Sequence, residues 1–98
     1  MKNKKAENKQ EAKSIALAWT QIAWDEYVSW QKEDLKIVEE INGLLEECIR
    51  TPFTGTGKPE PLKGNLTGYW SRRITRTHRL VYLPEDKVIY VISCRYHY

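Results

Sequence analysis

The segment from residue 51 to residue 68 constrains this chain more than any other feature, because it separates a helical part of the chain from a strand-rich part. It reads TPFTGTGKPEPLKGNLTG and contains four glycines and three prolines, a composition that fits neither a helix nor a central strand. Residues with helical periodicity precede the segment, and strand-like runs follow it. A loop of this length is uncommon in a compact domain unless it is functional, so the segment is itself a candidate site.

Two helices are predicted before the loop. Thr20 can cap a helix over about residues 21–31, and Asp34 can cap a second helix that Pro52 ends, because proline disfavours helical geometry in the residue before it. The apolar faces are expected to hold Trp24, Tyr27, Val28 and Gln31 in the first helix and Leu35, Val38, Ile41, Leu45, Cys48 and Ile49 in the second. The acidic side chains expected to point into water are Glu39, Glu40, Glu46 and Glu47.

Strands are predicted at both ends of the folded part. A short apolar run over residues 14–19 precedes the helices, and three further runs over 69–75, 79–83 and 87–94 follow the loop, with the last two joined by a turn at Pro84, Glu85 and Asp86. This order predicts an α/β fold of the α+β type, in which two N-terminal helices pack on a mostly antiparallel twisted sheet.

The length of 98 residues fits one domain with one core. Residues 1–13 have no aromatic and no β-branched side chain, so we expect a mobile or loosely helical basic tail there and a folded domain over residues 14–98. No apolar run suits a membrane span or a signal peptide, and the expected location is the cytoplasm. Cys48 and Cys94 are far apart in the sequence and form no paired ligand motif, so both are expected to fill core space, and no metal site is predicted.

Charge is unevenly distributed along the chain. Residues 14–47 carry two lysines against eight acidic residues, whereas residues 48–98 carry nine basic residues against three acidic ones. A basic half of this kind is typical of proteins that bind a polyanion such as RNA, although chance clustering on a solvated surface explains the charge alone equally well.

Three side chains in the basic half could together cleave RNA. The attack of a 2′-hydroxyl on the adjacent phosphate needs a base, a positive charge and an acid. Glu60, Arg79 and His97 could fill these roles, with Arg73 on the neighbouring strand and Lys58, Lys63 and Arg72 close by in the sequence. Each also has an ordinary explanation, as an exposed carboxylate, an outward-facing strand arginine or a terminal residue. His78, at a strand start, is interpreted as structural.

Aromatic residues are interleaved with these basic residues, as in proteins that stack bases of single-stranded RNA. The aromatic side chains concerned are Tyr69, Trp70, Tyr82, Tyr96 and Tyr98. Trp70 and Tyr82 are expected in the core, which leaves Tyr96 and Tyr98 as the better candidates for stacking.

The string GKPEPLKGNLTGYWSRRITRTHRLVY and the terminal SCRYHY resemble the YoeB toxins of the RelE superfamily. The resemblance covers about residues 14–98 and includes the TPF before the loop and the WQ after the first helix. It implies a RelE-like fold and a toxin of a type II toxin-antitoxin system. Such a toxin is a ribosome-dependent endoribonuclease that cuts mRNA in the ribosomal A site without a metal ion or other cofactor.

The resemblance also assigns roles to individual residues. It implies Glu60 as the general base, Arg79 as the cation that stabilises the phosphorane and His97 as the general acid. It implies supporting contacts with substrate at Lys63, Arg73 and Tyr98, and Lys58 and Arg72 are expected to bind substrate as well. Implied partners are mRNA on the ribosome, ribosomal RNA, a YefM-like antitoxin, operator DNA through the antitoxin complex alone, and a second copy of the chain. The tail over residues 1–13 departs from the family.

Two other functions remain open from the residues alone. The chain could bind RNA or the ribosome without cutting, in which case the message stays intact during translation arrest. It could instead be an interaction subunit whose basic cleft binds an acidic partner peptide and, with that partner, DNA.

Overall fold

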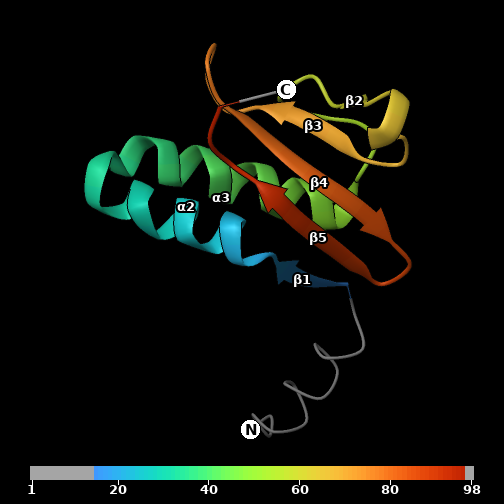
Figure 1. Ribbon diagram of the computed structural model, residues 1–98, viewed down its shortest axis with the longest axis horizontal. Coiled ribbons are helices and arrows are strands. Elements are labelled where there is room, and N and C mark those ends of the chain that lie inside the picture. The colour runs from blue at the N-terminus through green and yellow to red at the C-terminus, as the bar shows by residue number, and fades with distance from the viewer. Residues whose placement is uncertain (1–14, 97–98) are drawn as a thin grey trace, which may run out of the picture.

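Two helices cover one face of a five-stranded sheet in the computed structural model of the chain, which describes residues 15–96 (Figure 1). The strands are β1 (Ala16–Trp19), β2 (Glu60–Pro61), β3 (Trp70–Arg73), β4 (Arg79–Glu85) and β5 (Val88–Ser93), and the helices are α2 (Gln21–Glu33), α3 (Leu35–Arg50) and the short 3-10 helix η1 (Gly64–Leu66). The predicted α+β architecture is confirmed. The predicted tail over residues 1–13 lies outside the described residues.

Both predicted helix caps are confirmed. The Thr20 hydroxyl accepts a hydrogen bond from the Ala23 backbone N–H at 3.1 Å, and the Asp34 carboxylate accepts one from the Lys36 N–H at 3.0 Å. Each satisfies one of the backbone donors that the first turn of a helix leaves without a partner. The second helix ends at Arg50, just before the loop that begins the second half of the chain.

The predicted apolar face of α2 is right in part, since Tyr27 packs against the core, but wrong for Trp24 and Gln31, which are exposed; that of α3 is largely right. The side chains that α2 buries are Ala23 and Trp30, while Trp24 is 46% exposed. Small Ala23 lets the helix approach the sheet closely, and Trp24 packs outside against Trp19, with ring centroids 5.7 Å apart. The helix α3 buries Val38, Ile41, Leu44, Leu45 and Cys48, although Leu35 is exposed.

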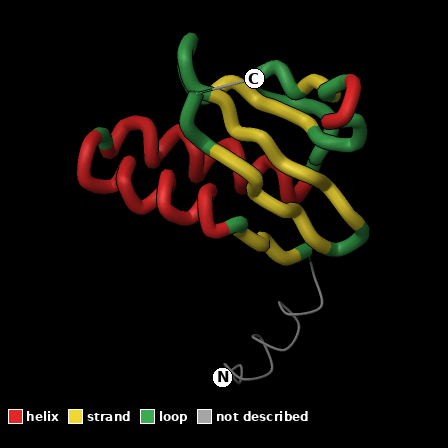
Figure 2. Tube along the Cα trace, viewed as in Figure 1, coloured by secondary structure: helices red, strands yellow, loops and turns green. Residues whose placement is uncertain are grey.

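The sheet order is β1-β5-β4-β3-β2, with β1 parallel to β5 and every other pair antiparallel. The turn between β4 and β5 is shorter than predicted, because Pro84 pairs with Ile89 inside the sheet and Glu85 pairs with Val88. The pairing of β3 with β4 extends only to Tyr82, so the N–H that Pro84 lacks is not needed for that ladder. Figure 2 shows the tight connection between the two strands.

The core lies between the helices and one face of the sheet. On β4 it includes Leu80 and Tyr82, and because strand side chains alternate, Arg79 and Val81 belong to the opposite face. This opposite face, without helices, is called the open face below. Cys48 and Cys94 are buried and free, as predicted. Among the described residues, no helix is long and apolar enough to cross a membrane.

Candidate active site

Glu60 and Arg79 meet on the open face of the sheet. Arg79 Nη1 donates to Glu60 Oε1 at 3.0 Å, although the two residues are 19 positions apart in the sequence. The strand register explains the contact: Glu60 of β2 lies opposite Ser71 of β3, and Arg73 of β3 lies opposite Arg79 of β4. Paired residues point to the same face, so the sheet brings a carboxylate and two guanidinium groups to one end of one surface.

The carboxylate is more exposed than its partner. The Glu60 side chain is 57% exposed and that of Arg79 is 21% exposed. Arg79 Nη1 also lies 3.5 Å from the hydroxyl oxygen of Ser71, a residue buried to 2% exposure. The sheet therefore restrains the guanidinium from beneath, while an approaching molecule can reach the carboxylate.

The other predicted basic residues divide into two groups. Lys58, Lys63 and Arg73 are exposed and lie along the chain on either side of β2 or at the end of β3. Lys58 adopts the left-handed backbone conformation, with φ of 50°. Arg72 differs from all three, because its side chain is fully buried.

The prediction that Arg72 contacts substrate is therefore wrong for this structure. Its strand neighbour Arg73 faces out, so alternation turns Arg72 toward the helices. There its guanidinium donates hydrogen bonds to backbone carbonyls of the Gly/Pro loop and to the hydroxyl of Tyr82. A buried charge must be satisfied by such partners, and Arg72 leaves no surface to a phosphate.

The end of the described chain lies against the first residue of β4. The Arg79 backbone N–H donates to the Tyr96 carbonyl at 2.9 Å, and the Tyr96 N–H donates to Nδ1 of His78 at 2.7 Å. The His78 ring packs edge-on to Trp30 at 4.7 Å. His78 thus ties the C-terminal segment to the helices. His97 and Tyr98 lie outside the described residues.

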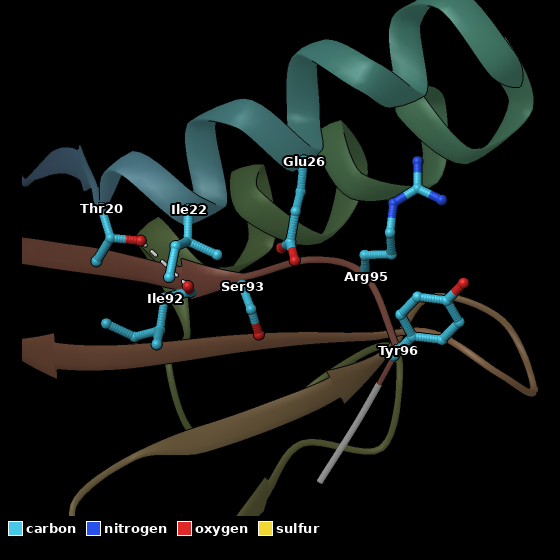
Figure 3. A pocket seen from close by; sticks show the side chains of 7 residues that line it. All are labelled: Thr20, Ile22, Glu26, Ile92, Ser93, Arg95 and Tyr96. Atoms are coloured by element: carbon cyan, nitrogen blue, oxygen red, sulfur yellow. Dashed lines mark hydrogen bonds between the residues drawn. The ribbon is translucent and has the colours of Figure 1, made fainter.

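Tyr96 also forms the rim of a hollow of about 310 Å³ beside this end of the sheet (Figure 3). Tyr96 is 61% exposed, and its role in stacking stays a prediction. The hollow lies between α2 and the end of β5, where the Glu26 carboxylate accepts a hydrogen bond from the Cys94 N–H at 2.8 Å. Arg95 lies over the Trp30 ring at 3.7 Å, so its charge is directed toward α2.

Three residues that hold the site together were missed by sequence reasoning. Ser71 shares the face of Arg73 by simple alternation, a signal that was present in the sequence. Glu47 was expected in water, but its carboxylate accepts a hydrogen bond from the Thr56 N–H at 2.7 Å. Tyr82 was expected in the core but not as a hydrogen-bond partner of the loop. Only the loop conformation, which the sequence does not reveal, identifies these last two roles.

The ionisation of the buried groups follows their surroundings. The hydrogen bond from Thr56 is the main cause of a lowered pKa of the Glu47 carboxyl, and burial raises the pKa of the Tyr82 phenol to about 12. Burial also raises the pKa of the Cys94 thiol to about 12, which disfavours the reactive thiolate. Among residues 15–96, no three His, Cys, Asp or Glu side chains gather as metal ligands would.

The open-face arrangement can perform one kind of chemistry readily. A carboxylate accessible to solvent can accept a proton, and an adjacent guanidinium can stabilise negative charge that develops on a phosphate. These are two of the three roles that RNA cleavage through the 2′-hydroxyl requires. The third, a proton donor, was assigned to His97 by resemblance.

Comparison with known proteins gives a consistent result. The family model described as YoeB-like toxin of bacterial type II toxin-antitoxin system matches residues 19–98. Toxin YoeB of Escherichia coli K12 is 55% identical over 84 residues, which make up 86% of this chain and 100% of that protein. A YoeB/ParE toxin structure from Agrobacterium tumefaciens superposes with a TM-score of 0.82 at 52% identity, covering 86% of this chain and 100% of the other.

Two further structures come from Staphylococcus aureus, a YoeB dimer and a heterotetrameric YoeB-YefM toxin-antitoxin complex. Both are 46% identical to this chain, with TM-scores of 0.81 and 0.80, and cover 86% of this chain and 98% of theirs. The YafQ structure from Escherichia coli, at 17% identity and a TM-score of 0.70, is similar in fold alone. This chain therefore belongs to the YoeB-like toxins of bacterial type II toxin-antitoxin systems.

Proposed function

We propose that this toxin is a ribosome-dependent endoribonuclease that cuts mRNA in the ribosomal A site and thereby inhibits translation. The observation that carries the proposal is the contact between Glu60 and Arg79 on an accessible surface of a YoeB-family chain. No cofactor has a role in the proposed reaction, because side chains supply the base, the cation and the acid.

In the proposed reaction, Glu60 removes the proton of the 2′-hydroxyl, whose oxygen attacks the neighbouring phosphorus. The bond to the departing 5′-oxygen then breaks, leaving a 2′,3′-cyclic phosphate and a 5′-hydroxyl. Arg79 lies 3.0 Å from Glu60, so it can stabilise the phosphorane that forms beside the base. The exposure of Glu60 supports its role, since substrate must reach its free oxygen.

The acid in this proposal is His97, which protonates the departing 5′-oxygen. Its assignment rests on the family motif RYHY and on the chain connection, because His97 directly follows Tyr96, whose carbonyl is bonded to Arg79. Lys58, Lys63, Arg73 and Tyr98 are proposed to bind the RNA around this centre. The exposed positions of the first three support that role.

The proposed groups explain why the ribosome would be needed. Acid and base catalysis contribute about 10²- to 10⁴-fold each, and an oriented cation about 3–4 kcal/mol. Their sum, roughly 10 kcal/mol, reaches the lower part of the range of enzymatic rate enhancement. A ribosome that holds the message in a reactive geometry could supply the rest, since alignment of reacting groups contributes about 7–11 kcal/mol.

The proposed partners follow from the same family. The S. aureus relatives form a YoeB dimer and a YoeB-YefM complex, and we propose a homodimer and a YefM-like antitoxin for this chain. An acidic antitoxin segment could cover the basic open face, including Arg73 and Arg79, and the complex would contact operator DNA through the antitoxin. Messenger RNA and ribosomal RNA are its cytoplasmic targets.

Mapping of message ends in a purified translation mixture tests the proposal. The parent should produce new ends within codons when ribosomes are present, and naked message should stay intact. Glu60→Ala and His97→Ala should abolish the new ends, whereas Glu39→Ala, on the exposed surface of α3, should leave them unchanged. Arrest of translation with intact message would instead indicate a silent ribosome binder and would refute the nuclease.

A further inference from the structure

The Gly/Pro loop is held by a group of hydrogen bonds, centred on buried Arg72, that the proposed chemistry does not use. Arg72 Nη1 donates to the Thr56 carbonyl at 3.1 Å, and Nη2 donates to the carbonyls of Thr54, at 2.9 Å, and Thr51. Arg72 is fully buried, so these carbonyls replace water around its charge. One guanidinium therefore fixes three points of the same short segment.

Glu47 of α3 completes this arrangement from the helix side. Its Oε1 accepts the Thr56 N–H at 2.7 Å and lies 3.8 Å from Arg72 Nη1. A Cβ on Gly55 would come within 1.9 Å of the same oxygen, and φ at Gly55 is +115°. The loop thus has a glycine where the carboxylate approaches most closely, in a conformation that other residues rarely adopt.

Tyr82 adds a third connection. Its hydroxyl accepts from Arg72 Nε at 3.2 Å and donates to the Pro52 carbonyl at 2.7 Å. The phenol, the guanidinium and the Glu47 carboxylate are called the loop clamp below. Every member bonds to the backbone of residues 51–56, and each comes from a different element.

The loop clamp is connected to the proposed base by very little chain. The Arg73 N–H donates to the Gly57 carbonyl at 2.7 Å, and after two more residues Glu60 enters the sheet opposite Ser71. A shift of the loop at Thr56 would therefore move Glu60 relative to Arg79. Misplacement of a reacting group by about 1 Å can lower a rate about 10²-fold.

We propose that Arg72 and Glu47 are positioning residues for the Glu60 carboxylate. They fix the loop over residues 51–57 and so hold Glu60 against Arg79 in the geometry that proton abstraction requires. This inference rests on the proposed function, because it assigns the loop clamp to the same reaction. It gives buried Arg72 an effect on catalysis without any contact with RNA.

Two substitutions at Glu47 separate positioning from simple loss of charge. Glu47→Gln retains an oxygen that can accept the Thr56 N–H, whereas Glu47→Ala removes it. Single-turnover cleavage on programmed ribosomes gives the cleavage rate at saturating toxin and the toxin concentration that gives half of that rate. Glu47→Ala should lower the rate about 10-fold or more and change the concentration less than about twofold, and Glu47→Gln should stay within about threefold of the parent rate.

A destabilised control excludes a merely structural explanation. Ile89→Ala removes core volume from β5, remote from the loop, and should keep the parent rate at temperatures where it is folded. The inference is overturned if Glu47→Ala and Ile89→Ala lose activity in proportion to lost stability. It is also overturned if the loss at Glu47→Ala lies in the half-saturating concentration.

Hydrogen exchange measured by mass spectrometry tests positioning without any cleavage. Glu47→Ala should exchange faster over residues 56–62 and unchanged over β4 and β5. If the parent cuts no message but this pattern appears, the proposed nuclease fails while the loop clamp stands. Unchanged exchange over residues 56–62 overturns the positioning inference, whether or not the parent is a nuclease.

Discussion

Two arginine–carboxylate pairs lie on opposite faces of the same part of the sheet. On the open face, the Arg79 and Glu60 side chains are 21% and 57% exposed, whereas beneath the sheet those of Arg72 and Glu47 are 0% and 24% exposed. The two faces are separated by one strand thickness, since Arg72 and Arg73 are neighbours on β3. The open-face pair therefore exposes its carboxylate, whereas the arginine of the pair beneath the sheet has no exposed surface.

This difference in the burial of the two arginines predicts different roles for the two pairs. An exposed ion pair contributes about 0–1 kcal/mol to stability, so the Glu60–Arg79 pair can be rearranged by a substrate at little cost. Arg72 is fully buried and its charge is satisfied by loop carbonyls, so this guanidinium holds its surroundings in place. We expect substitutions at the first pair to change activity and substitutions at the second to change stability as well.

The largest expected effect comes from Glu60→Gln. An amide in place of the carboxylate can still accept a hydrogen bond from Arg79 but cannot act as the base. The single-turnover cleavage rate should fall about 10²- to 10⁴-fold, while the free energy of unfolding should change by less than about 1 kcal/mol. A large loss of stability with the rate intact would reverse the comparison between the two faces.

On the buried side, Arg72→Met should lower the free energy of unfolding by about 1–3 kcal/mol or more, because three loop carbonyls lose their donor at once. Arg73→Met, one residue along the same strand, is the matched control and should change it by about 0.5 kcal/mol or less. Urea unfolding monitored by tryptophan fluorescence measures both. Equal effects would mean that burial does not distinguish the two arginines.

A smaller effect is expected from Tyr82→Phe, which leaves the Pro52 carbonyl without its donor and should cost about 1–3 kcal/mol at neutral pH. The neutral phenol is favoured in the folded state, since its pKa is raised from 10.0 to about 12. Its contribution is therefore present below pH 10 and lost as the pH rises toward 12. The stability difference between parent and variant should narrow over that range; a constant difference contradicts this prediction.

The smallest expected effect is at acid pH. The pKa of Glu47 is lowered from its ordinary 4.5, mainly by the Thr56 hydrogen bond, so its stabilising contribution is present above pH 4.5 and lost as the pH falls below that value. Glu47→Gln should weaken this dependence, which unfolding at a series of pH values from 6 downward would show. If the free energy of unfolding changes with pH in the same way for parent and variant, Glu47 does not contribute to the acid dependence and this prediction is wrong.

The sequence predicted features that depend on local chemistry. The caps Thr20 and Asp34, the end of the second helix and the strand-like runs all follow from neighbouring residues, and the structure confirms them. The face of α2 was wrong at Trp24, whose size suggested burial, whereas the buried positions of this helix are small Ala23 and Trp30. Helical periodicity identifies a helix more reliably than it identifies the side that packs.

The sequence suggested which residues belong to the candidate site, but not which face of the sheet each of them occupies. The motif suggested Glu60 and Arg79, and the structure brings these two side chains together. Arg72 was grouped with the surface cations because its orientation depends on strand register, and a shift by one residue moves a side chain to the other face. Glu47 was misplaced because its partner, the Thr56 N–H, comes from a loop whose path long-range contacts determine.

The attachment of the Gly/Pro loop to the loop clamp at one end and to the sheet at the other limits how the length of such a chain can vary. Ordinary surface loops tolerate insertions well, because the entropy cost of extra residues is small. Here the backbone between Thr51 and Thr56 is bonded to the interior, and Glu60 follows soon after as part of the sheet. One residue added between Thr56 and Glu60 would leave the interior bonds satisfied and displace the carboxylate, so homologues should conserve this spacing more strictly than the residue types within it.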